Sequence, residues 1–269
     1  IGSLENKGIE FTINAKPIVQ KDFTWDLGFN LTYNDGKITK LTGGDRTDYY
    51  VATGGVTVGT GGTVQAHAVD HPPYAFYVYQ QVYDEKGKPI ENTFVDRNGD
   101  GVINDADKYF YKKPTADVLM GLSSKFVYKA WDLSFTLRTS LNNYVYNNVE
   151  ADASNMSQLY APSGFLINRP TMVLENNFQG DGNYYMSDYF VQNASFLKCD
   201  NITLGYSFNL KKVGTGRVFA AVQNVFTVTK YKGLDPELVT GSGTGTNYGI
   251  DRDFYPRPLT SLIGLTLNF

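Results

Sequence analysis

Residues 96–107 place oxygen-bearing side chains at a spacing that suits a hard cation. If Asp96 is position 1, such side chains stand at positions 1, 3, 5, 9 and 12, with glycine at position 6 and an apolar residue at position 8. Calcium takes about six to eight oxygen ligands, and a glycine at position 6 permits the sharp turn around the ion. The pattern therefore predicts a Ca²⁺ site. Its ligands would be Asp96, Asn98, Asp100, the carbonyl of Val102, Asn104 (directly or through water) and Asp107.

The predicted calcium would have a structural role, because it would fix the conformation of a long loop. Two features depart from an EF-hand. Position 12 is Asp107, whose side chain is shorter than glutamate and makes bidentate closure harder, and no amphipathic helices flank the loop. The alternative is a surface turn in which Asp and Asn side chains bond their own backbone.

The remaining reactive residue types do not form a catalytic pattern. The glycines from Gly54 to Gly62 are not followed by Gly-Lys-Ser/Thr, so we expect a flexible loop and no phosphate site. His67 and His71 are four residues apart, but the prolines that follow disfavour the helix that would align them on a metal, so we expect loop histidines. Because the sequence also has no Gly-x-Ser-x-Gly turn and no evident acid–base pair of carboxylates, we expect no enzyme.

A group of tyrosines gathers in the second half of the chain. Three roles are open to them: stacking on sugars, holding a partner protein, or packing the segment that carries them. The sequence does not choose among these roles. The residues are Tyr144, Tyr146, Tyr160, Tyr184, Tyr185 and Tyr189.

Charge and cysteine content exclude several classes of protein. The 269 residues include 24 Lys and Arg and 27 Asp and Glu, for a net charge of −3, and no basic run provides a nucleic-acid footprint. The single Cys199 excludes an internal disulfide framework and a cysteine-based zinc cluster. The sequence contains no run of 18 apolar residues, so it predicts no membrane-spanning helix. The mean hydropathy of −0.30 still allows a β-barrel, whose alternating faces average out as polar.

Apolar and polar residues alternate with a period of two through most of the chain, which predicts an all-β fold. Every second residue from Phe23 to Tyr33 is apolar. Ser124 interrupts the apolar face of a later run, and 215–229 carries small or apolar residues on both faces, so its register stays open. The predicted strands are 9–15, 22–33, 115–129, 131–141, 202–208, 215–229 and 257–269.

The connections between these strands favour an antiparallel transmembrane β-barrel over a water-soluble β-sandwich. Short and long connections alternate, which places every long one at the same end, as in outer-membrane barrels with extracellular loops. Aromatic residues flank the short turns, where rings favour the membrane interface, and the charged side chains lie on the face opposite the apolar one. The short connections are 18–21, 129–130 and 210–214, and the long extracellular loops are 35–114, 142–187 and 230–256.

The number of predicted strands indicates an incomplete barrel. Seven is an odd number of strands, whereas bacterial single-chain barrels normally have an even number. We therefore expect the chain to be the C-terminal portion of a larger barrel that does not close by itself. Residues 73–83 have strand character but fall inside the first long loop, so we expect either an extracellular strand there or part of the upper wall of the barrel.

Several segments resemble the barrel of the SusC-like TonB-dependent transporters of Bacteroidota. They follow the family's order, span nearly the whole chain and end at a terminal phenylalanine, Phe269. The segments are Leu4–Glu10, Phe23–Asp26, Asp96–Asp107, Gln223–Thr227, Tyr231–Glu237 and Phe254–Pro258.

The resemblance implies a multi-pass protein of the bacterial outer membrane, in contact with its lipid. Residues 1–269 would be the C-terminal part of a barrel of about 22 strands, with no plug domain in this chain. The implied activity is energised import of an oligomeric nutrient, glycan rather than peptide. A SusD-like lipoprotein would form the lid, and the TonB complex would act through the missing N-terminal part. The alternative is a calcium-stabilised cell-surface adhesion or ligand-binding β protein.

Overall fold

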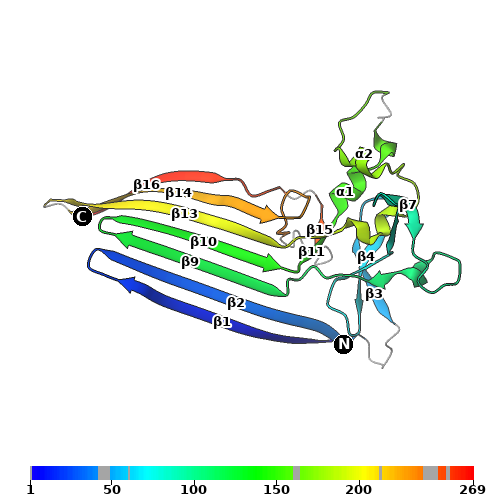
Figure 1. Cartoon of the computed structure of the whole chain (residues 1–269), viewed down its shortest axis with the longest axis horizontal. Coiled ribbons are helices and arrows are strands. Elements are labelled where there is room, and N and C mark those ends of the chain that lie inside the picture. The colour runs from blue at the N-terminus through cyan, green and yellow to red at the C-terminus, as the bar shows by residue number, and fades with distance from the viewer. Residues whose placement is uncertain are drawn as a thin grey trace.

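A computed structural model describes residues 2–41, 49–59, 61–159, 164–211, 214–238, 248–252 and 255–269. Within these ranges the largest element is one antiparallel sheet with seven strands in the order β1-β2-β9-β10-β13-β14-β16 (Figure 1). These strands are β1 (Ser3–Val19), β2 (Phe23–Lys40), β9 (Val118–Tyr128), β10 (Trp131–Leu141), β13 (Phe196–Leu210), β14 (Gly214–Thr229) and β16 (Thr260–Asn268). The all-β antiparallel prediction is confirmed.

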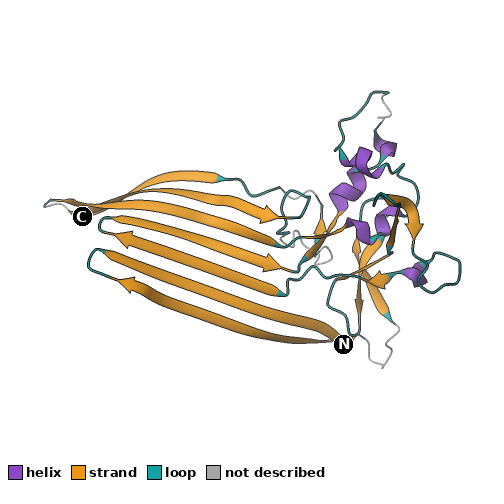
Figure 2. Cartoon of the chain, viewed as in Figure 1, coloured by secondary structure: helices purple, strands orange, loops and turns teal. Residues whose placement is uncertain are grey.

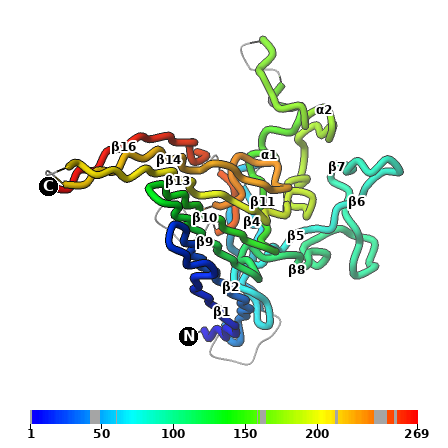
Figure 3. The backbone as a smooth tube through the Cα atoms, turned by 60° about the vertical axis from the view of Figure 1, so that its left-hand side comes forward, coloured from blue at the N-terminus to red at the C-terminus, as the bar shows by residue number. Residues whose placement is uncertain are grey.

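The sheet is an open, curved wall rather than a closed cylinder (Figure 3). Each strand pairs with the next one in sheet order, and β1 and β16 form the two edges of the described part of the sheet. The short connections lie at one end of the strands and the long ones at the other (Figure 1). The two edge strands of the described sheet do not pair with each other, which fits the incomplete barrel that the odd strand count predicted.

Several sequence-based boundaries were wrong. The strand predicted at 9–15 runs from Ser3 to Val19, and the one predicted at 202–208 begins at Phe196, so the second long loop continues past 187. The first long loop was placed from residue 35, but β2 continues to Lys40, because its end still pairs with β1 and also exchanges backbone hydrogen bonds with Asp70 and His71. The single strand expected at 73–83 is two strands, β5 (Ala75–Val78) and β6 (Gln81–Tyr83). They separate at Tyr79, whose backbone bonds to 186 and 188 instead.

The long connections fold together into a second region at one end of the sheet, which we call the cap (Figure 2). In the sheets described there, the strand orders are β3-β4-β5-β8, β6-β7 and β12-β11-β15. Its further strands are β3 (Tyr50–Gly55), β4 (Thr63–Ala68), β7 (Pro89–Phe94), β8 (Tyr109–Phe110), β11 (Tyr144–Asn147), β12 (Val191–Asn193) and β15 (Ile250–Asp251). Its helices are α1 (Asn148–Ala153) and α2 (Met172–Asn176), with 3₁₀ turns at Asp105–Asp107, Met156–Gln158, Tyr184–Met186 and Asp188–Phe190. None of the helices described is long and apolar enough to cross a membrane.

The principal buried core lies in the cap and draws on all three long connections. Phe76, Tyr146, Tyr185 and Phe190 are fully buried, and Ile250 joins them from the third connection. The Tyr146 hydroxyl donates to the Tyr185 carbonyl at 2.5 Å. These tyrosines thus pack the cap.

The other members of the tyrosine group are placed less deeply. Tyr184 is buried and donates to the Ala151 carbonyl, whereas Tyr144 and Tyr189 are partly buried at the edge of the same core. Tyr160 lies outside the described residues. Packing is therefore the role that the structure supports for the buried members of the group.

The two faces of the sheet differ as the alternation predicted. On the apolar face large side chains stand uncovered, with Ile9 exposed to 69% and Ile263 to 83%. Ser124, which interrupts the apolar side chains of β9, accepts a hydrogen bond from the Trp25 indole at 2.9 Å, so its hydroxyl is satisfied on that face. Val218 lies opposite Leu265, which settles the open register of β14. Below, the apolar face is the side of the sheet that carries Ile9 and Ile263, and the polar face is the opposite side.

The facing of β2 gives a direct test. Leu27 lies on the apolar face and Asn30 on the polar face of this strand. If the apolar face contacts lipid, Leu27→Arg in the full-length protein should cost about 2–4 kcal/mol of folding free energy near mid-bilayer. Urea titration of folding into lipid vesicles measures it.

Asn30→Arg is the matched control and should fold nearly as well as the unaltered protein. Gly28 is not suitable, because a Cβ at this position would lie 2.5 Å from the Ser123 hydroxyl. Equal destabilisation by arginine at Leu27 and Asn30 would contradict the assigned facing.

Candidate functional site

The polar face carries a pocket of about 700 Å³ beside the cap, which we call the inner pocket. β2, β9 and β10 form its floor, and the third long connection forms its roof. Floor residues include Asn30, Thr32, Asn34, Ser123, Thr136, Arg138 and Ser140, and roof residues include Pro236, Glu237, Leu238 and Tyr248.

Neutral hydrogen-bonding groups dominate the floor of the inner pocket. Asn143 is held in place because its amide donates to the Ala194 carbonyl at 3.0 Å and its oxygen accepts from Ser140 at 3.0 Å. Asn30 and Asn34 are exposed, so their amides are available to a solute. Amides and hydroxyls can both donate and accept, and they therefore suit a neutral polar ligand.

The charged side chains that line the inner pocket are paired. Arg138 donates to Glu237 at 2.9 and 3.1 Å and also bonds to both oxygens of Asp200. Asp117, at the rim, pairs with Lys113 at 2.7 Å. The lining thus offers a solute no uncompensated charge among the described residues.

Glu237 is the centre of a larger ion cluster that ties the third connection to the wall. Besides Arg138, it accepts from Lys198 at 3.1 Å and pairs with Arg257 at 3.2 Å, and Lys198 also bonds to Asp235 at 2.7 Å. Arg138 and Lys198 stand on β10 and β13, while Asp235 and Glu237 stand on the connection. The cluster holds residues 234–238 in the position that roofs the inner pocket.

The cluster also fixes the charge of its central carboxylate. Partial burial alone would raise the pKa of Glu237, but hydrogen bonds from Arg138 and then Lys198 outweigh it and lower the pKa to about 2. Glu237 therefore remains ionised at any pH near neutrality. Sequence reasoning did not find this cluster. A signal was present, since Lys198 and Asp200 place two charges beside the apolar residues Phe196, Leu197 and Cys199.

The predicted calcium loop closes on itself through its first and last carboxylates. Asp96 accepts from the backbone N–H of Gly99 at 2.7 Å and of Gly101 at 2.8 Å, and Gly101 has the positive φ expected of the sharp turn. Asp107 is fully buried and accepts from the N–H groups of Arg97 and Asn104, each at 2.9 Å. Bonds from Asn104 first, and from Arg97 next, lower the pKa of Asp107.

The other predicted ligands take local roles. Asn98 accepts from the N–H of Asp100, Asp100 accepts from that of Val102, and the Val102 carbonyl accepts from the Asn104 amide at 3.1 Å. The structure therefore brings Asp96 and Asp107 together, while the middle ligands cap their own turns. Within the ranges described, no group of three or more His, Cys, Asp or Glu side chains is arranged around a common metal position.

The two histidines do not form a common site. His67 lies in β4 rather than in a loop, and its Nδ1 accepts the N–H of Tyr74 at 3.3 Å. His71 stacks on Phe110 with ring centroids 3.7 Å apart. Each ring is thus used in local packing or hydrogen bonding.

Comparison with known proteins gives consistent results. No family model matches the chain. It is 56% identical over its whole length to TonB-dependent receptor SusC of Bacteroides thetaiotaomicron, and 30% identical to TonB-dependent receptor P39 of Formosa agariphila. The chain spans 27% and 31% of the lengths of these two relatives.

Solved structures agree in fold. The chain superimposes over its full length on 30% of a chain in the structure of the RagAB peptide transporter, with a TM-score of 0.73 and 21% sequence identity. It also superimposes on the RagAB peptide importer in its 'closed-closed' state with a TM-score of 0.73. This identity is low, so the likeness supports the fold and not a shared substrate.

The ion cluster predicts how residues 231–238 respond to pH. The pKa of Glu237 is lowered from its ordinary 4.5 to about 2, so the stability it contributes is complete above about pH 4.5 and is lost as the pH falls towards 2. Hydrogen exchange of these backbone amides in the full-length protein, corrected for intrinsic rates, should show constant protection from pH 7 to 5. Protection should then decline below pH 4.5.

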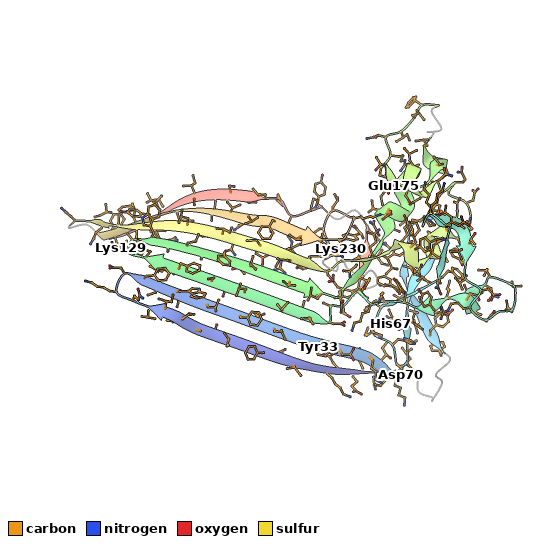
Figure 4. All side chains as sticks on the ribbon, viewed as in Figure 1. Tyr33, His67, Asp70, Lys129, Glu175 and Lys230 are labelled. Atoms are coloured by element: carbon orange, nitrogen blue, oxygen red, sulfur yellow. The ribbon has the colours of Figure 1, made fainter. Side chains whose placement is uncertain are left out.

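Glu237→Gln should remove much of that protection already at pH 7, because Arg138 and Lys198 lose the carboxylate they share. Glu175→Gln is the control, because Glu175 is an exposed residue of the cap, away from the cluster (Figure 4). Protection in the unaltered protein that declines above pH 5, or an unchanged Glu237→Gln variant, would contradict the assigned role.

Proposed function

This chain belongs to the SusC-like TonB-dependent receptors, corresponding to a C-terminal part of the barrel, and we propose that it forms part of an importer in the bacterial outer membrane. In this arrangement the apolar face contacts lipid and the polar face lines the lumen. The cap then lies on the extracellular side, since outer-membrane barrels carry their long loops there. Family membership favours this function over the adhesion alternative.

The observation that carries the proposal is the inner pocket on the polar face. It lies where the lumen meets the cap, so a solute entering from outside reaches it before the rest of the wall. The ion cluster holds the third long connection, which forms the roof of the pocket, against the wall. The pocket is therefore the part of this chain best placed to contact an imported solute.

The lining of the inner pocket favours a glycan over a peptide. Sugars are neutral and rich in hydroxyls, which match the amides of Asn30 and Asn34. A peptide brings charged termini, and the charged groups Arg138, Glu237 and Asp117 are already paired with each other or with Lys113. Both structural neighbours are named for peptide transport or import, so peptide is the substrate class that the test must exclude.

Import needs partners outside these 269 residues. We propose that a SusD-like lipoprotein covers the cap side as a lid, and that the TonB complex supplies energy through the part of the receptor that this chain does not contain. Because the chain spans about three tenths of its relatives, the test requires the full-length receptor.

We also propose that residues 96–107 bind a structural Ca²⁺ through Asp96, Asn98, Asp100, Val102, Asn104 and Asp107. The support is the fold of the loop and its local charge. The carboxyl groups of Asp96 and Asp107 lie close enough to interact. The nearest basic side chains are used elsewhere, because Lys108 pairs with Asp105 and Arg97 lies over the Tyr109 ring. An external cation would balance the two carboxylates.

Uptake by cells that carry the full-length receptor tests the import proposal. We expect accumulation of fluorescent neutral oligosaccharides that stops when an uncoupler collapses the proton-motive force. Asn34→Ala should reduce uptake, because it removes an amide from the inner pocket, and Leu31→Val on the opposite face is the control. Uptake of oligopeptides alone would contradict the glycan assignment, and uptake that ignores the uncoupler would contradict energised import.

Limited proteolysis tests the calcium proposal. Adding Ca²⁺ to chelated full-length protein should slow cleavage within 84–114, because the ion crosslinks the two ends of the loop, while the barrel stays folded. Asp107→Asn should abolish this response, and the neighbouring exposed Asp105→Asn should keep it. A high-resolution map should show oxygens about 2.3–2.6 Å from the ion. Equal cleavage with calcium and with chelator would rule the site out.

A further inference from the structure

Leu119 is an apolar side chain on the polar face of the wall, inside the inner pocket. It lies in β9 directly opposite Thr32 of β2 and Ser140 of β10, so the three side chains emerge on the same face. The residue is exposed to 50%. Because burial of apolar surface is favourable, this uncovered leucine offers a ligand an apolar contact in a pocket that otherwise presents hydroxyls and amides on its floor.

Hydrogen-bonding groups surround Leu119 closely. Gly121 follows it on the same face of β9, and a Cβ at this glycine would lie only 2.8 Å from the amide nitrogen of Asn30. The glycine thus leaves room for the Asn30 amide to lie over the strand beside the leucine. Thr32 and Ser140 flank Leu119 on the two neighbouring strands. The result is an apolar spot with donors and acceptors along its edge.

Tyr248 supplies a second apolar surface from the roof of the inner pocket. The residue is partly exposed, and its main chain is held on both sides. Its carbonyl accepts from the buried Gln65 amide at 2.7 Å, and the next carbonyl, of Gly249, accepts from the Tyr146 N–H at 2.9 Å. Ile250 then enters the core of the cap, fully buried. Because this segment is already ordered, packing of a ligand on Tyr248 costs little conformational entropy.

We propose that the inner pocket binds a sugar as a closed pyranose ring, with the C–H groups of the ring against Leu119 and Tyr248 and its hydroxyls at Asn30 and Thr32. The inference rests on the proposed function and deepens it, because it names the part of a glycan that the pocket recognises. A pyranose ring has faces of C–H groups and an edge of hydroxyls, which match an apolar spot with a polar edge. Leu119 and Tyr248 are then specificity-determining residues, although neither of them reaches a sugar hydroxyl through Leu119.

Isothermal titration calorimetry on the purified full-length receptor tests the contribution of the two apolar side chains. The probes are maltotriose, cellotriose and xylotriose, and the one that binds most tightly is used for the variants. Leu119→Ser and Tyr248→Ser should each weaken its binding on the order of five- to tenfold. Leu119→Met and Tyr248→Phe should retain it, because both keep the apolar surface. Since Leu119 faces the lumen, its substitution should leave the barrel folded.

Saturation-transfer difference NMR on the same samples separates direct contact from a structural role. Protons of the receptor transfer saturation to the sugar protons that lie against them. In the unaltered receptor the ring C–H protons of one sugar residue should receive the strongest saturation. Leu119→Ser should remove this preference even at sugar concentrations that restore occupancy, whereas Leu119→Met should keep it.

Leu174→Ser is the matched control, because Leu174 is exposed to 71% in α2 of the cap, away from β9 (Figure 1). Equal affinity of Leu119→Ser and Leu174→Ser would overturn the inference, and so would failure of all three trisaccharides to bind the unaltered receptor. Unchanged affinity of Leu119→Ser with energised uptake of oligosaccharides contradicts this inference alone. Binding that depends on Leu119, with uptake that ignores the uncoupler, contradicts only the proposed function.

Discussion

The antiparallel hydrogen-bond ladder from β1 to β16 is the constraint on which the rest of the structure depends. Side chains alternate between faces with a period of two, so a slip of one residue would exchange the apolar and polar faces. The ladder also admits local irregularities that serve the polar face. Between Cys199 and Asn201 the register shifts against both neighbouring strands, and the extra residue, Asp200, reaches Arg138. One bulge thus supplies a carboxylate to the ion cluster.

The ladder also determines where the cap forms. All three long connections leave the sheet at the same end, so none of them can bury its apolar residues except against the others. Tyr146, Tyr185 and Ile250 come from different parts of the chain and meet in one core. The cluster around Glu237 then anchors the third connection to the wall. Cap and wall are therefore joined by ion pairs as well as by the covalent chain.

The inner pocket presents neutral groups to a solute, although charged side chains line it. In the inner pocket Arg138 and Glu237 neutralise each other, which leaves amides and hydroxyls as the groups that a solute meets. The wall thus offers a neutral polar surface on its polar face.

The sequence by itself determined the alternation, the short turns, the existence of the seven strands of the wall and the sharp turn at Gly101, because each depends on residues adjacent in the chain. It did not determine the split at Tyr79, the packing of the tyrosines or the cluster around Glu237. Arg138 and Glu237 are 99 positions apart, and Tyr146 and Tyr185 are 39 apart. No local period relates residues at such distances. Only the tertiary structure brings them together, because their partners are chosen by the register of the sheet and by the burial that three connections share.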